Sequence, residues 1–517
     1  MIYSTSVMSM VKLLDIEESL KANLDVYVQE MQSKLDTIKL FQDSLKRETL
    51  TTLDQKEEYM ANPLNAFPLL RRLNQDWPKW VRYIKLAIAT KKTKEMEVHL
   101  KSAPSDDDLK VALKGITRIE EFYDQHAADL TKGILLGRQF NSSFTAPDCV
   151  ALADFHYNQT KYSGSTHWYR MALRLHTLPQ GELYKKVLGL KRKMVYKKYA
   201  KALLKESITL DKGKPTPLAM SEWNILAKEV VHKDNYDNVK NLIDEYLTGE
   251  EKIFQDVAAQ SKRKPSKLKR GCRGEWQRKS SPELVCRYNK DTSAFLKIAP
   301  LKLEFLNMQP LIVLYHEVLY EKEFKSMRDI AIFNATMTDG WTYVDFDKEG
   351  KPKPQDRVVK MITFQGTTAS FTLSINRRIA DMSGLEMHGN MGLYLTNYGL
   401  GGHFGKHVDY VELAKRPPDF FADLGGDRIA TALLYATDVP LGGTTVFTKL
   451  KISVEPKKGN ALIWFNLDHA GQPDPLTEHS VCPVVMGSRW TISKWIHERQ
   501  QVFKKPCSSN IRMENAI

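Results

Sequence analysis

The sequence lacks long apolar runs and several short motifs that identify common partners. No uninterrupted apolar run reaches about 18 residues, so we predict no membrane-spanning helix. The first residues, MIYSTSVMSMVKLL, contain neither a basic leader nor an unbroken apolar segment, and they make a poor signal peptide. Zinc-finger spacings, RNP-type aromatic motifs and GxxxxGK[ST] loops are also missing. We therefore expect no nucleic-acid partner, although the formal charge is +14, and we interpret the basic run at 261–270 as a solvated linker.

Cysteine is scarce, with five in 517 residues, but four of the five are spaced as two pairs. The pairs are Cys272 with Cys286, and Cys482 with Cys507. Loops closed at these spacings suit structural disulfides, which form in oxidising compartments. Glycosylation sequons begin at Asn141, Asn158 and Asn334. The cysteine pairs and sequons together favour a secretory-pathway lumen over the cytosol.

The first part of the chain predicts helices. From residue 20 to residue 45, apolar residues recur at alternating steps of three and four, which is typical of a long amphipathic helix. The pattern suits a coiled-coil seam, and it equally suits packing against later helices of the same chain. We favour the first interpretation and assign 1–140 to an N-terminal helical dimerisation region.

Residues 141–248 are predicted to form short helices joined by tight turns, which is typical of a tetratricopeptide-like module. Aromatic platforms bind extended proline-rich peptides. We therefore predict a peptide-substrate-binding domain that uses Tyr157, Trp168 and Tyr196. The alternative is that these side chains form the core between the helices. Residues 249–300 are expected to form a basic linker with a disulfide loop.

From residue 301 onward the pattern changes to short strands separated by glycine turns. A strand and a helix are predicted after Pro310, and a second helix around 374–382. The strands expected beyond it are 393–398, 429–436, 444–447, 452–455, 461–465 and 490–495. Such strands indicate a jelly roll. The predicted fold class is multidomain α+β, with an all-α N-terminal part and a double-stranded β-helix domain at 301–517.

Three side chains of this domain have the composition of a metal site. His407 and Asp409 are two residues apart, so on one strand they project from the same face. A second His-x-Asp, at His232 and Asp234, shows that the pair alone is weak evidence. His479, beyond several strands and just before the last one, completes a facial triad of two histidines and one carboxylate. The triad suits Fe(II) with open positions, whereas Zn(II) on the same ligands would support hydrolysis.

Arg489 favours iron over zinc. It lies on the closing strand, ten residues after His479, and period-two alternation sets Arg489 and His497 on one face. A planar guanidinium binds a carboxylate through paired hydrogen bonds. We therefore predict that Arg489 anchors the distal carboxylate of 2-oxoglutarate. The alternative is a surface arginine on an edge strand.

With these residues in place, the whole chain resembles the α subunit of collagen prolyl 4-hydroxylase. The matching stretches are NYGLGG with HVDY, DRIATALLY, GGTTVF, PKKGNALIWFN, EHSVCPV, SKWIHER and, in the helical part, FTAPDC with HWYRMALR. The helical, linker and oxygenase parts appear in the same order. The resemblance implies a lumenal endoplasmic-reticulum enzyme that hydroxylates proline at its 4-position in X-Pro-Gly repeats. It would use Fe(II), dioxygen, 2-oxoglutarate and ascorbate.

The resemblance also implies roles for further residues and partners. It sets Tyr435 and Thr431 in the keto-acid pocket and gives His497 a part in cosubstrate binding or decarboxylation. It matches the two cysteine pairs to intrachain disulfides and leaves Cys149 free. A tetramer of two such α subunits and two protein disulfide isomerase β subunits is expected. Because the chain ends in ENAI, without a retrieval signal, the isomerase would supply retention.

Three departures from the family keep other functions open. Arg489 stands where the family usually has lysine, 187–210 is lysine-rich with few tyrosines, and 350–368 differs from the usual sequence. The second hypothesis is therefore a low-activity peptide-binding or assembly subunit of a prolyl hydroxylase complex. The third is a hydrolytic zinc enzyme.

Overall fold

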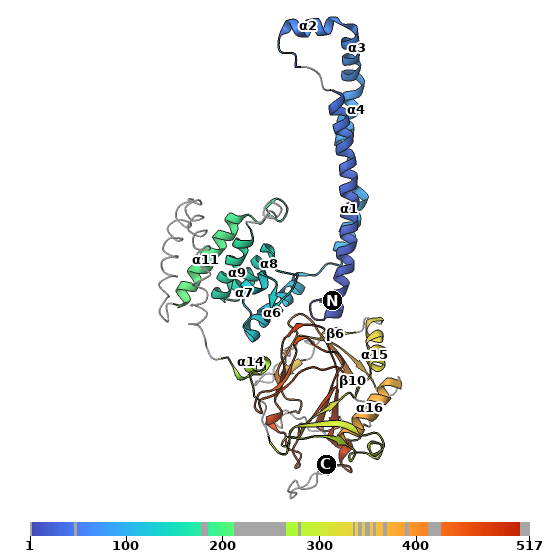
Figure 1. Ribbon diagram of the computed structural model, residues 1–517, viewed down its shortest axis with the longest axis vertical. Helices are drawn as coiled ribbons and strands as arrows, with labels where there is room; N and C mark the ends of the chain where they lie inside the picture. The colour runs from blue at the N-terminus through green and yellow to red at the C-terminus, as the bar shows by residue number, and fades with distance from the viewer. Residues whose placement is uncertain are drawn as a thin grey trace. The chain divides into compact units, whose positions relative to one another are not determined.

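The structure is a computed structural model of the chain (Figure 1). The residues that it describes are 3–45, 49–176, 185–210, 265–277, 281–333, 337–339, 344–346, 352–354, 358–365, 370–387, 392–411 and 425–506. The chain divides into two compact units. The smaller unit is Met10–Ser105, and the larger one combines Met1–Ser9 with Asp106–Ile517.

The smaller unit consists of helices, and most of the long helix α1 belongs to it. In chain order they are α1 (Val7–Ser44), α2 (Leu53–Ala61), α3 (Pro63–Arg71), a π-helical turn (Arg72–Asp76), α4 (Trp77–Lys85) and α5 (Thr90–Leu100). Thr52 and Gln55 form a capping box that starts α2. Pro63 occupies the first turn of α3, where a backbone N–H has no helical partner to lose. The helix predicted at 20–45 is confirmed, although it begins earlier, at Val7.

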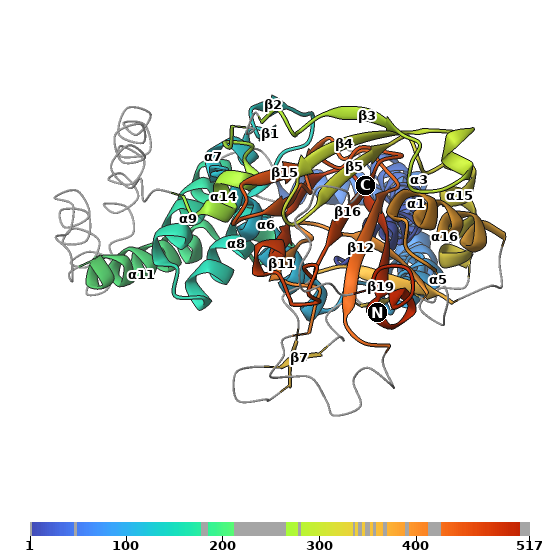
Figure 2. The ribbon, with the colours of Figure 1, turned by 90° about the horizontal axis from the view of Figure 1, so that it is seen from below.

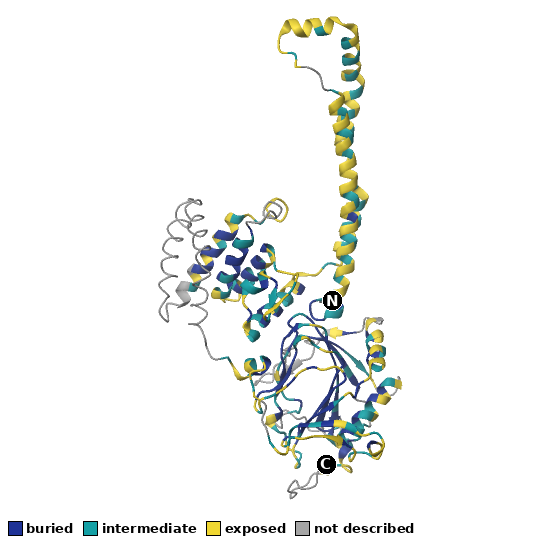
Figure 3. Cartoon of the chain, viewed as in Figure 1, coloured by how far each residue is buried: buried dark blue, intermediate teal, exposed yellow. Residues whose placement is uncertain are grey.

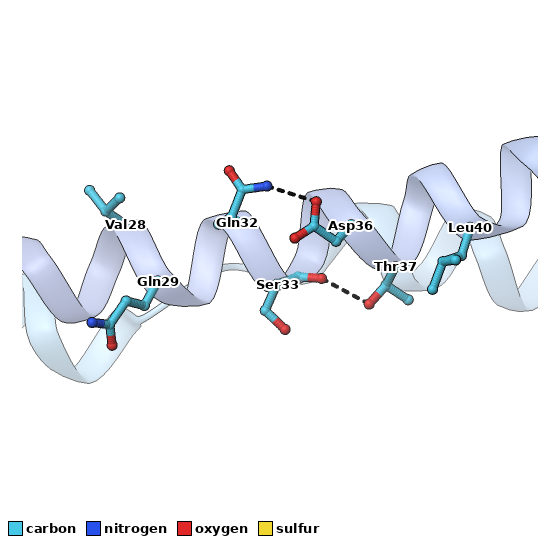
Figure 4. A pocket seen from close by; sticks show the side chains of 7 residues that line it. All are labelled: Val28, Gln29, Gln32, Ser33, Asp36, Thr37 and Leu40. Carbon is cyan, nitrogen blue, oxygen red and sulfur yellow. Dashed lines mark hydrogen bonds between the residues drawn. The ribbon is translucent and has the colours of Figure 1, made fainter.

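Much of α1 is exposed (Figure 3), including part of its apolar stripe. Leu24, Met31 and Leu35 are 48%, 43% and 44% exposed, whereas Phe41 stacks on Trp80 with 4.2 Å between ring centroids. An open depression on the same helix, shown in Figure 4, is lined by Val28, Gln29, Gln32, Ser33, Asp36, Thr37 and Leu40. Exposed apolar side chains at helical spacing are what a second helix would cover, so dimerisation through α1 stays a prediction.

The larger unit contains a helical module. Its elements are α6 (Asp106–Tyr123), α7 (Ala127–Thr131), the hairpin β1 (Ile134–Leu135) and β2 (Arg138–Gln139), α8 (Ala146–Asn158), α9 (Tyr162–Leu175) and α11 (Arg192–Leu210). Thr145 and Asp148 form the capping box of α8. The predicted short helices are present up to Leu210, and 211–264 lies outside the described residues. No helix in the described part of the chain is long and apolar enough to span a bilayer.

The β domain that follows has a large and a small antiparallel sheet (Figures 1 and 2). The large sheet, in spatial order, is β3 (Cys286–Asn289), β4 (Leu301–Asn307), β5 (Ile312–His316), β16 (Ala461–Phe465), β12 (Arg428–Tyr435), β19 (Arg489–His497), β10 (Leu393–Tyr398), β9 (Lys360–Phe364) and β6 (Thr338–Asp339). The small sheet is β11 (Phe404–His407), β17 (His479–Val481), β14 (Thr445–Phe447) and β15 (Ile452–Val454). Two two-stranded antiparallel sheets complete the described strands: β13 (Leu441–Gly442) with β18 (Val484–Met486), and β7 (Val344–Phe346) with β8 (Pro352–Pro354).

Strand alternation sorts the side chains of the large sheet into two cores. On the outer face, residues such as Ala432 and Ile492 pack against α15 (Glu321–Phe333) and α16 (Ser370–Ser383). On the inner face, residues such as Leu433 contribute to a core shared with the small sheet, in which Phe447 takes part. The jelly roll predicted from the sequence is confirmed. The strands predicted at 393–398 and 461–465 coincide with β10 and β16.

Two predicted domain boundaries differ from the compact units. Helix α6 lies inside the predicted dimerisation region 1–140, yet it packs on α8 and on α14 (Lys267–Cys272) of the larger unit. Similarly, α14 and β3 fall within the predicted linker 249–300. Helix α14 packs on β14 and β15, and β3 is an edge strand of the large sheet. The described end of that range is therefore part of the β domain.

The predicted disulfide pairing is wrong for the described cysteines. Cys272 is bonded to Cys482, with 5.6 Å between their Cα atoms. Cys286 is an exposed free thiol, Cys149 is a buried free thiol, and Cys507 lies outside the described residues. The reason is the fold: α14 packs against the small sheet beside Cys482, whereas Cys286 lies on an edge strand of the large sheet.

Peptide mapping without reduction tests this pairing. We expect one linked pair of peptides containing Cys272 and Cys482, and we expect alkylation of Cys286 in the folded protein because it is exposed. Cys149 is the internal control: burial raises the pKa of its thiol, so it reacts only after unfolding. A peptide that links Cys272 to Cys286 would contradict the observed fold.

Candidate metal centre

Two strands of the small sheet set the histidines of the site side by side. Strands β11 and β17 pair antiparallel, and His407 stands directly opposite His479. The centroids of the two imidazole rings are 4.2 Å apart. Backbone pairing thus joins residues that are far apart in the sequence.

Asp409 completes the cluster from outside the strand. Because β11 ends at His407, Asp409 follows in a bend, and the predicted strand alternation does not extend to it. Its Oδ1 lies 3.7 Å from His407 Nε2, and its Oδ2 lies 3.9 Å from His479 Nε2. One ligand atom from each residue lies within 4.8 Å of the others. The predicted convergence of these three side chains is confirmed, although the local geometry differs.

Each imidazole is oriented through its other nitrogen. His407 Nδ1 lies 2.8 Å from the carbonyl oxygen of Gly405, and His479 Nδ1 lies 3.0 Å from that of Thr477. A carbonyl oxygen only accepts, so each Nδ1 carries the proton. Each Nε2 therefore keeps its lone pair for a metal, and the carbonyls fix the ring orientation.

The carboxylate of Asp409 is held by a chain of hydrogen bonds. Thr431 Oγ1 donates to Asp409 Oδ2 at 2.7 Å, and Asn466 Nδ2 donates to Thr431 Oγ1 at 3.0 Å. Burial opposes ionisation of this carboxyl, but the combined effect of the two histidines, Arg428 and the hydrogen bond from Thr431 outweighs it and lowers the pKa of Asp409. Thr431 was predicted to contact the keto acid. Its hydroxyl proton is directed to the ligand Asp409, so Thr431 positions that carboxylate, and its place in the keto-acid pocket stays a prediction.

The donor set fits Fe(II). It offers two neutral imidazoles and one ionised carboxylate, without a thiolate, and such a triad leaves three further positions on an iron for other ligands. Among the described residues it is the only cluster of three or more potential ligands. The rings of Phe404 and Trp464 pack against the histidines, with centroids 3.6 Å from His407 and 4.8 Å from His479. These apolar surroundings limit access of water.

Arg489 is fully buried, yet one of its nitrogens has no partner. Its Nε donates to the carbonyl of Gly443 at 2.9 Å, and its Nη2 donates to Thr445 Oγ1 at 3.3 Å. Its Nη1 is buried without a hydrogen-bond partner in the described part of the chain. A buried guanidinium that lacks an anion is costly, so Nη1 fits the carboxylate of a ligand. Full burial excludes the alternative of a surface arginine.

Tyr435 and His497 lie on the same inner face of the large sheet. Tyr435 Oη donates to Thr445 Oγ1 at 2.8 Å, and burial raises the pKa of Tyr435 to about 12, so its proton stays in place at neutral pH. His497 Nδ1 lies 3.0 Å from the carbonyl of Gly426, and burial lowers the pKa of His497. The imidazole of His497 is therefore neutral. The catalytic roles expected for both residues stay predictions.

The aromatic residues predicted to bind peptide are mostly core. Trp168 is fully buried, and its Nε1 donates to Glu120 Oε1 at 2.9 Å. Tyr196 is buried in the same core, which joins α8, α9 and α11. Only Tyr157 is partly exposed, and it packs on Tyr162 with 5.4 Å between ring centroids. Packing between helices thus removes Trp168 and Tyr196 from the predicted platform.

Two of the three predicted glycosylation sequons lie among the described residues. Asn141 and Asn158 are exposed, as glycosylation requires, and Asn334 lies outside the described residues.

Two residues of the site were not predicted from the sequence: Asn466, which donates a hydrogen bond to Thr431, and Thr445, which accepts one from Arg489. Period-two alternation could have predicted the position of Thr445, because it lies two residues from the buried Phe447 and therefore on the same face of β14.

Two family models match the chain. The model described as "Prolyl 4-Hydroxylase alpha-subunit, N-terminal region" matches residues 6–137, and that of the "2OG-Fe(II) oxygenase superfamily" matches residues 393–497. The second match includes His407, Asp409, His479 and Arg489.

Curated relatives cover nearly the whole chain. The human protein "Prolyl 4-hydroxylase subunit alpha-1" is 31% identical over 98% of this chain and 95% of its own length. The subunit alpha-1 of Caenorhabditis elegans is 29% identical over 97% and 90%, and the subunit alpha-2 of Gallus gallus is 28% identical over 98% and 95%.

Solved structures give a weaker comparison. The viral collagen prolyl hydroxylase from Paramecium Bursaria Chlorella virus-1 is 18% identical over 36% of this chain and 94% of its own, with a TM-score of 0.29. A Pseudomonas putida prolyl-4-hydroxylase is 14% identical over 36% and 91%, with a TM-score of 0.24. At these scores the likeness supports no structural argument.

Metal binding tests the site directly. We expect His479→Ala to abolish binding of one Fe(II) per chain under anaerobic conditions, because a facial triad that loses a ligand holds the metal weakly. The matched control is His469→Ala, a loop histidine outside the cluster, which keeps its metal. Binding is measured by anaerobic dialysis and metal analysis. Equal metal content in both variants would show that the cluster is not the site.

Proposed function

Because the chain belongs to the prolyl 4-hydroxylase α-subunit family, we propose that it hydroxylates peptidyl proline at the 4-position. The chain is an Fe(II)- and 2-oxoglutarate-dependent dioxygenase of the prolyl 4-hydroxylase type. Its substrates are X-Pro-Gly repeats or other proline-rich secreted chains. The reaction consumes dioxygen and 2-oxoglutarate and releases succinate and carbon dioxide.

One observation carries this proposal: a buried, unsatisfied guanidinium nitrogen lies in the same β domain as the metal triad. Arg489 Nη1 has no partner among the described residues, while the rest of the guanidinium is fixed by Gly443 and Thr445. A hydrolytic zinc site needs only a metal and a water molecule. A buried cation supports a site for an anionic cosubstrate, and therefore an oxygenase.

The residues of the site have separate tasks in this reaction. His407, Asp409 and His479 would hold the iron, which when bound activates dioxygen for oxidation of the keto acid and of the substrate C–H bond. Thr431 orients the carboxylate of Asp409 by its hydrogen bond. Arg489 orients the keto acid by binding its distal carboxylate, which fixes its position before reaction.

The apolar inner face keeps the site dry. Leu433, Phe447 and Trp464 are buried between the two sheets next to His479 and Tyr435. Exclusion of water strengthens the pairing of Arg489 with a carboxylate. It also protects reactive species from loss to solvent.

The proposal also covers the reductant, the compartment and the subunit assembly. They are the use of ascorbate, a place in the endoplasmic-reticulum lumen, and assembly as two α subunits with two protein disulfide isomerase β subunits. The disulfide between Cys272 and Cys482 supports an oxidising compartment. The exposed sequons at Asn141 and Asn158 support the same compartment. The exposed stripe on α1 supports α–α association.

A second candidate is a peptide-binding or assembly subunit with little turnover. The observation that favours it is the burial of Trp168 and Tyr196, which leaves the helical module without the predicted aromatic platform. If this candidate is right, the helical module binds its peptide through other side chains. The chain would then keep the metal triad but would not hold a peptide in position for hydroxylation.

Turnover distinguishes the two candidates. The full chain, co-expressed with protein disulfide isomerase, is incubated with proline-rich peptides and labelled 2-oxoglutarate. We expect iron-dependent release of labelled succinate together with 4-hydroxyproline in the peptide, and neither product from His407→Ala. A wild-type chain that binds the peptide but forms neither product would favour the second candidate.

A change of the anchor tests the keto-acid site. We expect Arg489→Met to raise the KM for 2-oxoglutarate on the order of 100-fold, because it removes one member of a buried charge pair. Arg489→Lys keeps the positive charge but loses the paired N–H donors of the guanidinium, so it should raise the KM for 2-oxoglutarate less than Arg489→Met does. The control is Arg499→Met, an exposed position on the turn after β19. An unchanged KM in Arg489→Met would remove the anchor from the proposal.

A further inference from the structure

The N-terminal segment 3–9 is buried within the larger unit. Ser4, Thr5 and Ser6 are 5%, 0% and 0% exposed, and Ser9 is 3% exposed. Hydroxyl side chains are usually exposed, and a buried hydroxyl requires a partner inside the protein. The partners of this segment therefore indicate what it does.

Ser6 has its partner on Asn397, a fully buried residue of β10. Ser6 Oγ donates to Asn397 Oδ1 at 2.7 Å, and the backbone N–H of Met8 donates to the same oxygen at 3.3 Å. The amide nitrogen of Asn397 bonds in another direction, to Ser488 Oγ at 3.0 Å and to the backbone oxygen of Arg489 at 3.4 Å. One side chain thus joins the N-terminal segment to the backbone of the anchor.

The segment also touches the glycine loop that leads to His407. The N–H of Leu400 donates to the carbonyl of Ser4 at 3.3 Å. Gly399 lies so close that a Cβ at this position would collide with the backbone of the segment. Glycine is therefore the one residue that permits this approach without a shift.

Helix α6 holds the other side of the segment. Ser4 Oγ donates to the backbone oxygen of Asp108 at 3.1 Å, and the N–H of Ser4 donates to Asp108 Oδ1 at 3.5 Å. Arg118, on the same helix, donates through Nη1 to the carbonyl of Gly401 at 2.6 Å. The segment is fixed between α6 and the loop, so its position is defined from both sides.

We infer that residues 3–9 are a positioning element of the keto-acid site. Through Ser6 and Asn397 the segment fixes the backbone of Arg489, and through Leu400 it fixes the loop before His407. This inference rests on the proposed role of Arg489 as the carboxylate anchor. Ser6 and Asn397 act through Arg489, and small displacements of an anchor weaken the binding of its ligand.

Ser6→Ala in the full chain tests this inference. The substitution removes the hydroxyl and leaves Asn397 Oδ1 with the Met8 N–H alone. We expect the KM for 2-oxoglutarate to rise about fivefold, as for the loss of one buried hydrogen bond, with kcat within about twofold of wild type. The matched control is Ser19→Ala, a partly exposed serine of α1 whose Oγ donates to the carbonyl of Asp15, and it should leave both constants unchanged.

A second variant and a binding measurement separate positioning from simple destabilisation. Asn397→Asp keeps the acceptor for Ser6 but removes the donor to the Arg489 carbonyl, and it should also raise the KM. Binding of 2-oxoglutarate to the Mn(II)-loaded protein is followed by tryptophan fluorescence, and melting temperatures are recorded in parallel.

The outcomes are distinct. Weaker 2-oxoglutarate binding in the folded variants supports the inference. Lower melting temperatures with an unchanged KM and unchanged binding would overturn it, because the segment would then be merely structural. If the wild-type chain itself neither binds nor decarboxylates 2-oxoglutarate, the proposed function fails, and that failure is visible before any variant is compared.

Discussion

The direction in which each side chain leaves strands β12 and β19 is the constraint on which the site depends. Period-two alternation turns Thr431 and Arg489 toward the small sheet, while Ala432 and Ile492 face the helices. A slip of one residue would exchange these faces and turn the apolar set toward the metal site. Pairing of β19 with both β10 and β12 fixes the register, so the same contacts that build the core also direct the side chain of Arg489.

Much of this arrangement is local in origin and could be predicted. Strands β10 and β16 follow from short runs bounded by glycine turns, and the inward set of β19 follows from period-two alternation. Asp409 is different. Strand β11 contains an irregularity and ends at His407, so the carboxylate reaches the site through a bend that no periodic pattern describes.

The errors share one cause, which is contact between segments distant in sequence. The bond between Cys272 and Cys482 depends on α14 packing against the small sheet. The burial of Trp168 depends on three helices meeting at once. Helix α6 joins the larger unit because Gly115 lets it lie against the backbone of Gly401, which helical periodicity alone does not indicate. Periodicity reports which face is apolar, but not which element covers it.

Thr431 and Thr445, on the inner faces of the two sheets, differ in which of their hydroxyl donors and acceptors are already used. Thr431 accepts from Asn466 and donates its proton to Asp409, so its hydroxyl is committed to the metal ligand. Thr445 accepts from both Tyr435 and Arg489, which uses both of its lone pairs. Among the described residues, the hydroxyl proton of Thr445 has no hydrogen-bond acceptor. Thr445 therefore has a hydroxyl proton to offer the carboxylate that we propose to pair with Arg489.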